Sequence, residues 1–246
     1  MQKNVEKMSI NYSPNFNTKK RSRSKIKYLI YHYTGMKSES AAIKRLTNLN
    51  SKVSCHYFIK FNGEIVRIVP DLYVAWHAGI SSWKKDVFLN SNSIGIEISN
   101  PGHEYGYRNF NNKQVLSILS LSKKLKKKYK IKKENILGHS DIAPLRKIDP
   151  GEKFPWEKLS KQGLGIWHNY KNNFLIKYRG ISVYKSRDKM KFIKNLNKIG
   201  YCLKNKKKSL LIKTIRAFQR HYRKDLINGH LDKECLIIAE NLSKKS

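Results

Sequence analysis

The sequence predicts an α/β domain, with a central mixed β-sheet flanked by helices, followed by a small C-terminal domain of three helices. Up to about residue 160, short runs of β-branched and aromatic residues alternate with amphipathic helical patterns. An Asn-Gly pair between two alternating runs marks a β-hairpin, so at least one strand pair is antiparallel. From about Tyr184 onward the pattern is helical alone.

The first strand and helix follow a basic start. Residues 26–32 are apolar, β-branched and aromatic, which predicts a buried strand. His32 then lies at or near the C-terminal end of that strand, where α/β folds tend to place ligands. Residues 38–50 predict a helix, because their apolar residues recur near helical spacing.

Two further strand regions follow. Residues 57–61 and 64–69 alternate around Asn62-Gly63 and predict a hairpin. Residues 94–98 predict another strand, in which three isoleucines share one face while Glu97 points to the opposite face together with Gly95. A single carboxylate in an apolar strand calls for a functional explanation.

A long helix comes next, capped by Asn111 or Asn112 and running to about Tyr129. Its expected buried residues are Val115, Ile118, Leu119, Leu121 and Leu125, with a run of lysines outside. A short strand at 135–137 then leads into Gly138-His139 and a loop that runs through Pro155.

We expect four parts in the chain: a basic N-terminal extension (1–25), a catalytic domain (26–167), a linker (168–183) and a helical domain (184–246). The expected helical positions, listed in order, are Met190, Ile193 and Leu196, then Leu211, Ile215, Phe218 and Tyr222, then Cys235, Ile238 and Leu242. Asp232 is expected to cap the last helix.

Composition limits the functional classes. With 39% hydrophobic residues the chain has enough apolar material for a core, and Cys55, Cys202 and Cys235 are too widely spaced for a zinc knuckle, so we interpret them as core residues. The net charge of +35 attracts polyanions. The charge is equally consistent with solvated lysine faces that have no specific partner.

No nucleic-acid-binding motif accompanies the charge, so we expect no specific nucleic-acid partner. We also expect no conventional secretory signal, because the first residues are polar and lack an apolar core segment. No run approaches the length of a transmembrane helix, so we expect a soluble or peripheral protein, with the choice between envelope and cytoplasm left open.

Two histidines and one carboxylate at the ends of predicted elements form a sufficient ligand set for a catalytic zinc ion. Such a site takes three protein ligands and keeps a fourth position open. We choose His32, His139 and Asp149 as the ligands of Zn²⁺. Any one of these histidines taken alone would more often have a structural role.

Four short motifs carry a resemblance to a known family. They are Trp76-His77-Ala78-Gly79, Ser93-Ile94-Gly95-Ile96-Glu97, Asp149-Pro150-Gly151 and Phe154-Pro155-Trp156. As a set they resemble the N-acetylmuramoyl-L-alanine amidases of the AmpD and AmiD type, over residues 28–156. The resemblance implies the amidase fold, which is shared with peptidoglycan recognition proteins, and hydrolysis of the amide bond between N-acetylmuramic acid and L-alanine.

The resemblance also assigns roles to residues. It implies zinc ligands at His32, His139 and Asp149, a catalytic glutamate at Glu97 and a catalytic lysine at Lys147. Related phage amidases and recognition proteins commonly carry cysteine where Asp149 stands. His56, Trp76 and His77 are candidate substrate-binding residues, and a structural role for the two histidines is an equal alternative.

The implied chemistry is that of a zinc hydrolase. Zinc polarises the scissile carbonyl and lowers the pKa of a bound water toward about 7. Glu97 would act as general base and then as general acid, and Lys147 would stabilise the oxyanion. The expected substrate is peptidoglycan or a muropeptide, and the expected state is a monomer.

The helical tail resembles the type 1 peptidoglycan-binding fold through the segments 215–220 and 229–232. The alternative is a generic three-helix bundle in which Phe218 and Tyr222 are only core residues. For the whole chain, the alternative is a peptidoglycan recognition module that binds without cleaving.

Overall fold

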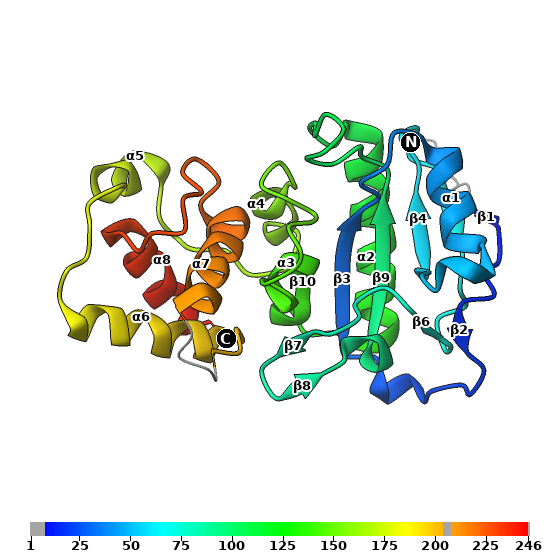
Figure 1. Cartoon of the computed structure of the whole chain (residues 1–246), viewed down its shortest axis with the longest axis horizontal. Coiled ribbons are helices and arrows are strands. Elements are labelled where there is room, and N and C mark those ends of the chain that lie inside the picture. Colours follow the sequence, from blue (N-terminus) through cyan, green and yellow to red (C-terminus); the bar gives the residue numbers. More distant parts are fainter. Residues whose placement is uncertain (1–7, 204–207, 246) are drawn as a thin grey trace. The chain divides into compact units, whose positions relative to one another are not determined.

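The computed structural model describes residues 8–203 and 208–245, and the chain divides into two compact units (Figure 1). Unit 1 comprises residues 1–79 and 88–137, and unit 2 comprises residues 80–87 and 138–246. Residues 1–7, the start of the expected N-terminal extension, lie outside the described part of the chain.

A six-stranded sheet forms the centre of unit 1, in the order β1-β5-β4-β9-β3-β10. The strands, listed in that order, are β1 (Met8–Ile10), β5 (Ile65–Arg67), β4 (Tyr57–Ile59), β9 (Ser93–Ile98), β3 (Tyr28–Tyr33) and β10 (Ile136–Gly138). Strands β3 and β4 both pair in parallel with β9, whereas β4 and β5 are antiparallel. The predicted mixed sheet is therefore confirmed.

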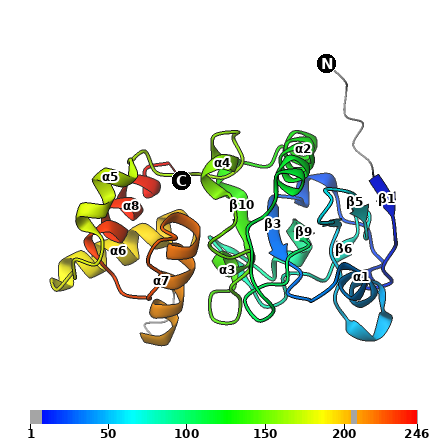
Figure 2. The same ribbon diagram turned by 90° about the horizontal axis from the view of Figure 1, so that it is seen from above.

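The central strands β3 and β9 are almost entirely buried, because helices cover both faces of the sheet. Helix α2 (Asn112–Tyr129) covers one face, where the hydroxyl of Tyr31 donates to Ser122 Oγ at 2.7 Å. Helix α1 (Glu39–Thr47) packs on the other face, where Phe58 joins a core cluster with Ala42. Figure 2 shows the two helices on opposite sides of the sheet.

Local chemistry explains where these helices begin. Ser38 caps α1 by accepting from the backbone N–H of Ala41. Asn111 caps α2 in a reciprocal capping box with Gln114. Both N-termini are therefore where the sequence predicted them, and α1 ends a few residues early, in the 3-10 turn η2 (Leu49–Ser51).

The predicted hairpin forms, but its turn differs from the two-residue Asn62-Gly63 connection. The backbone N–H of Gly63 donates to the carbonyl of Lys60 at 3.0 Å, so Phe61 and Asn62 are the central turn residues. A second short pairing joins β2 (Phe16–Asn17) to β6 (Val74–Ala75). With β1 on the main sheet, the part of the N-terminal segment that is described belongs to unit 1.

Unit 2 combines a small hairpin with the C-terminal helices. The hairpin is β7 (Ser82–Trp83) and β8 (Asp86–Val87). The helices, listed in order, are α3 (His139–Ile142), α4 (Trp156–Ser160), α5 (Asn172–Leu175), α6 (Ser186–Ile199), α7 (Lys208–Tyr222) and α8 (Lys233–Ser243). Short 3-10 turns complete the chain at η1 (Arg23–Lys25), η3 (Leu89–Asn92), η4 (Lys133–Asn135) and η5 (Ile176–Tyr178).

The predicted core of α8 is correct, and that of α7 is correct except at Leu211, which is only partly buried. In α6 the buried residues are Phe192, Leu196 and Ile199, and Met190 is exposed, because the helical face is rotated from the expected one. Asp232 caps α8 as predicted. Cys55 and Cys235 are buried, but Cys202 is only partly buried, and all three are free thiols.

Within the described residues, none of the helices has the length and apolar character that crossing a membrane requires.

Candidate metal centre

His32 is held by the central strand β3. It is the fifth of six residues in that strand and pairs in register with Glu97 of β9. Because residues paired in neighbouring parallel strands face the same side of a sheet, His32 and Glu97 share one face. This face of the sheet is the one opposite α2, because Tyr31, the neighbour of His32 in the strand, points toward α2.

His139 and Asp149 are the two ends of a closed loop in unit 2. His139 is the first residue of α3, directly after β10. The N–H of Ser140 donates to the carbonyl of Asp149 at 2.8 Å, and His139 Nδ1 lies 3.0 Å from Asp149 Oδ2. Both side chains are buried.

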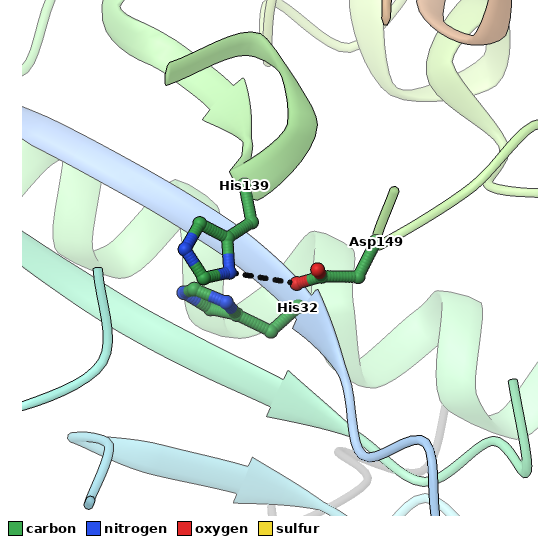
Figure 3. Close-up of side chains that lie close together, drawn as sticks. All are labelled: His32, His139 and Asp149. Carbon is green, nitrogen blue, oxygen red and sulfur yellow. Dashed lines mark hydrogen bonds and ion pairs between the residues drawn. The ribbon is translucent and has the colours of Figure 1, made fainter. Parts of the chain in front are cut away.

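The structure brings together the three predicted ligands. One ligand atom from each of His32, His139 and Asp149 lies within 4.8 Å of the other two, and all three side chains are buried (Figure 3). In a tetrahedral zinc site with bonds of about 2.0–2.1 Å, ligand atoms are about 3.3 Å apart. The observed limit of 4.8 Å lies above that value, and the chemistry of the donor set, two imidazoles and one carboxylate, fits a divalent metal of the zinc type.

A second histidine is hydrogen-bonded to the first candidate ligand. His32 Nε2 lies 3.0 Å from His77 Nδ1, and His77 Nε2 lies 3.2 Å from Ser93 Oγ. The hydroxyl of Ser93 donates to the carbonyl of Leu89, so with a neutral His77 it accepts from His77 Nε2–H. His77 Nδ1 then accepts from His32 Nε2–H, which leaves His32 Nδ1 as the nitrogen for a metal.

Gly95 makes room for this arrangement. A Cβ atom at position 95 would lie 2.4 Å from Cγ of His77, far inside any real carbon contact. Glycine in a strand interior commonly marks such a close approach. The ring of His77 needs the space that the missing side chain of Gly95 leaves, which explains why one motif has histidine and the other has glycine at these positions.

The two predicted catalytic residues each lie near a candidate ligand. Glu97 is paired with His32 across two strands, and Lys147 is two residues before Asp149 in the chain. Glu97 is the one residue of β9 that is only partly buried, although its Oε2 atom is itself covered. Lys147 is half-buried, two residues before Asp149, and its backbone N–H donates to the carbonyl of Ala143 at 3.0 Å. The neighbouring Arg146 donates to the carbonyl of Ile80.

The remaining candidates differ in exposure. Trp76 is half-buried and its indole N–H donates to Asn17 Oδ1 at 2.7 Å. His56 is completely buried: its Nδ1 accepts from the N–H of Gly95 and its Nε2 lies 3.1 Å from the carbonyl of Tyr73. Burial, together with the nearby Arg21 guanidinium, lowers the pKa of His56 to about 3.

Comparison with known proteins decides the family. The family model described as N-acetylmuramoyl-L-alanine amidase matches residues 22–152. The chain belongs to the N-acetylmuramoyl-L-alanine amidase family. It is 36% identical over 235 residues to the N-acetylmuramoyl-L-alanine amidase AmiD of Escherichia coli, covering 90% of this chain and 83% of AmiD.

Shorter members of the amidase family match only part of the chain. The 1,6-anhydro-N-acetylmuramyl-L-alanine amidase AmpD of Haemophilus influenzae is 40% identical over 108 residues, which are 44% of this chain and 56% of AmpD.

Solved amidase structures match over almost the whole chain. The E. coli AmiD complex with anhydro-N-acetylmuramic acid-L-Ala-D-γ-Glu-L-Lys has a TM-score of 0.79 at 34% identity, covering 93% of both chains. AmpDh3 of Pseudomonas aeruginosa has a TM-score of 0.79 at 29% identity, covering 94% of this chain and 96% of AmpDh3. The amidase fold predicted from the sequence is therefore confirmed, and the chain is an enzyme of this family.

Sequence analysis missed two supporting residues of this amidase. Ser93 and Gly95 stood inside a quoted motif, yet neither was given a role. Glycine within an apolar strand was a readable signal for Gly95. Nothing in the sequence pairs Ser93 with His77, because 16 residues and a 3-10 turn separate them.

Proposed function

We propose that this amidase hydrolyses the amide bond between N-acetylmuramic acid and L-alanine with a zinc ion held by His32, His139 and Asp149. The observation that carries the proposal is the buried cluster of these three side chains. Two imidazoles and one carboxylate are a ligand set used by catalytic zinc, which keeps a fourth position for water or substrate.

Glu97 and Lys147 complete the proposed chemistry. Zinc at this site would supply Lewis-acid polarisation of the carbonyl and a lowered pKa for a bound water. Glu97, which shares the sheet face of His32, takes the proton from the attacking water and passes it to the departing alanine amine. Lys147, held close to Asp149 in the chain, offers a positive charge to the oxygen on which charge develops.

The supporting residues are assigned from their contacts. We assign His77 to the orientation of His32, because the two rings are hydrogen-bonded. We assign His56 to the structure of the sheet, because no part of its side chain is exposed and both ring nitrogens have partners. Trp76 retains the substrate-contact role, since its ring is only half-buried.

Muropeptides and intact peptidoglycan are both proposed substrates. Two similar structures are complexes, AmiD with an anhydro-N-acetylmuramic acid tripeptide and AmpDh3 with an anhydromuramic pentapeptide. We extend that substrate class to this chain, as an enzyme of cell-wall turnover or recycling. Incubation with purified sacculi and with anhydro-muropeptides, in parallel, measures the preference between polymer and fragment.

For the helical domain (184–246) we propose peptidoglycan binding, with 26–167 as the catalytic domain and 168–183 as the linker. The support is the resemblance of segments 215–220 and 229–232 to the type 1 binding fold, and the net charge of +35, which suits a carboxylate-bearing wall. The active unit is proposed to be a monomer. A pull-down of the chain on insoluble sacculi at low and high salt separates specific wall affinity from charge attraction alone.

Elemental analysis of the purified protein tests the zinc proposal. We expect one zinc per chain, and loss of zinc in His139→Ala and Asp149→Ala. Absence of zinc, or full zinc content in His139→Ala, would contradict the ligand assignment. The alternative of a non-catalytic recognition module is not favoured, because the ligands and Glu97 are all present.

A further inference from the structure

A buried carboxylate, Asp141, fixes the turn that carries His139. Asp141 is 1% exposed and lies two residues after His139. Its Oδ2 accepts from the N–H of Gly138 at 2.8 Å and from His221 Nδ1–H at 2.8 Å, and its Oδ1 accepts from the Tyr201 hydroxyl at 2.7 Å. A buried carboxylate needs such donors, because leaving it unpaired is costly.

Both side-chain donors come from the C-terminal part of the same unit, one from α7 and one from the segment after α6. His221 lies in the last turn of α7, which packs against α3 (Figures 1 and 2). The His221 ring is buried and stacks on Trp156 at 3.7 Å between centroids. Tyr201 follows α6, and burial together with the nearby Asp141 raises the pKa of its hydroxyl well above the usual value.

The segment that contains the β7–β8 hairpin contacts both Gly200, next to Tyr201, and the loop between His139 and Asp149. The N–H of Lys84 donates to the carbonyl of Gly200 at 2.7 Å, and the Trp83 ring packs so closely on Gly200 that a Cβ there would lie 2.3 Å from it. Arg146, inside the loop between the two ligands, donates to the carbonyl of Ile80 at 2.7 Å. The ligand loop is therefore joined to the hairpin at the surface, and the hairpin is joined to Gly200 after α6 through the buried Trp83.

We propose that Asp141 is a positioning residue, and that the C-terminal helices, through Tyr201 and His221, hold the turn that presents His139 to the metal. The helices would then complete the metal-binding fold in addition to any role in wall binding. A module that acted only as a tether would raise the local concentration of catalyst at the polymer and would need no buried hydrogen bonds to this turn. The inference rests on the zinc site proposed above.

Four variants of the full chain test the role. Asp141→Ala removes the acceptor of all three hydrogen bonds, and Tyr201→Phe removes one donor. Asp141→Asn can keep all three, because its Oδ1 can accept from Gly138 and His221 while its amide donates to the Tyr201 hydroxyl. Phe192→Leu is the control, since Phe192 is buried in α6 and its ring contacts Phe218.

Each variant is measured in three ways: melting temperature, zinc dissociation constant by chelator competition, and the visible spectrum of the cobalt-substituted protein. We expect Asp141→Ala to weaken zinc binding by about 10-fold or more, the range found when supporting residues around a metal are lost, and to change the cobalt spectrum. Tyr201→Phe should weaken binding less, and Asp141→Asn should restore it. Phe192→Leu should lower the melting temperature and leave zinc affinity unchanged.

The positioning role is overturned if folded Asp141→Ala keeps the parental zinc affinity and cobalt spectrum, or if Phe192→Leu weakens zinc binding equally. If Asp141→Ala does not fold, the test uses Tyr201→Phe, and parental zinc affinity and cobalt spectrum in that variant overturn the positioning role. A parental protein that binds no metal overturns the zinc site and this role together. A parental protein that binds zinc, with variants that bind it as tightly, overturns the positioning role alone.

Discussion

His32 Nε2 lies 3.0 Å from His77 Nδ1, and this contact ties a predicted metal ligand to a residue of a separate motif. Residues that orient a metal-bound imidazole fix its tautomer, and their loss typically costs about 10–100-fold in metal affinity or activity. The relationship moves His77 from a candidate substrate contact to a proposed support of the site.

We therefore expect His77→Leu to weaken zinc binding by about 10–100-fold. Gly95→Ala should act in the same direction, because its Cβ would displace the His77 ring. His77→Gln should recover part of the affinity, since its amide can accept from His32 and donate to Ser93. Chelator competition measures these constants, with Ile96→Val as the control from the opposite face of β9. If both His77→Leu and Gly95→Ala bind zinc as tightly as the parental protein, His77 does not support the metal site.

Glu97→Gln should reduce turnover by about 10²–10⁴-fold while zinc content and melting temperature stay parental. The amide keeps the shape of the side chain but does not accept the proton of the attacking water. Steady-state rates and zinc content are measured on one preparation. A folded, zinc-loaded Glu97→Gln enzyme with near-parental turnover would leave Glu97 without a catalytic role.

Lys147→Met should lower kcat by about 10²–10³-fold, the cost of losing one stabilising group for a developing oxyanion. Methionine retains most of the apolar stem and removes the charge. The matched control is Lys153→Met, a change of charge at the far end of the same loop region. An equal, small effect in both variants would indicate that only the net charge of the loop matters.

Acid should destabilise the protein through His56. The pKa of His56 is about 3 in the folded chain, against 6.5 as its ordinary value, so between these pH values the unfolded chain binds a proton that the folded chain does not. Stability present above about pH 6.5 is then lost as pH falls toward 3, by at most about 1.4 kcal/mol per pH unit.

Melting temperatures between pH 7.5 and pH 4 measure this loss. His56→Asn should be less stable at neutral pH and should show a flatter pH dependence than the parental chain. The pKa of His168 is also lowered, to about 4, but its effect on the pH dependence of stability is the same in the parental chain and in His56→Asn, so it does not affect the difference between them. Parallel pH profiles for the two proteins would contradict the assignment to His56.

Local signals were sufficient for most of the fold. The caps Asn111 and Asp232, the hairpin around Asn62-Gly63 and the alternation of β9 are short-range patterns, and the structure has them close to the predicted positions. In each of these cases the information lies within a few neighbouring residues. The motifs also selected His32, His139 and Asp149 as candidate ligands, and the structure brings one ligand atom from each within 4.8 Å of the other two.

Contacts between distant segments could not be predicted from the sequence. Tyr201 and Asp141 are 60 residues apart, and His221 and Asp141 are 80 apart, so no periodicity relates them. Met190 was expected in the core because Met190, Ile193 and Leu196 recur at a spacing of three residues. In the structure Phe192 is buried instead and contacts Phe218. The face that a helix buries depends on its partner.

Mass spectrometry of the reaction products tests the central claim most directly. The zinc-loaded enzyme is incubated with an N-acetylmuramoyl peptide that begins with L-alanine, then after chelation, and again after zinc is restored. We predict a saccharide with a free lactyl carboxylate and a peptide with a free alanine amine, formed only when zinc is present. Cleavage at any other bond, no cleavage, or cleavage that persists unchanged after the metal is removed would contradict the account.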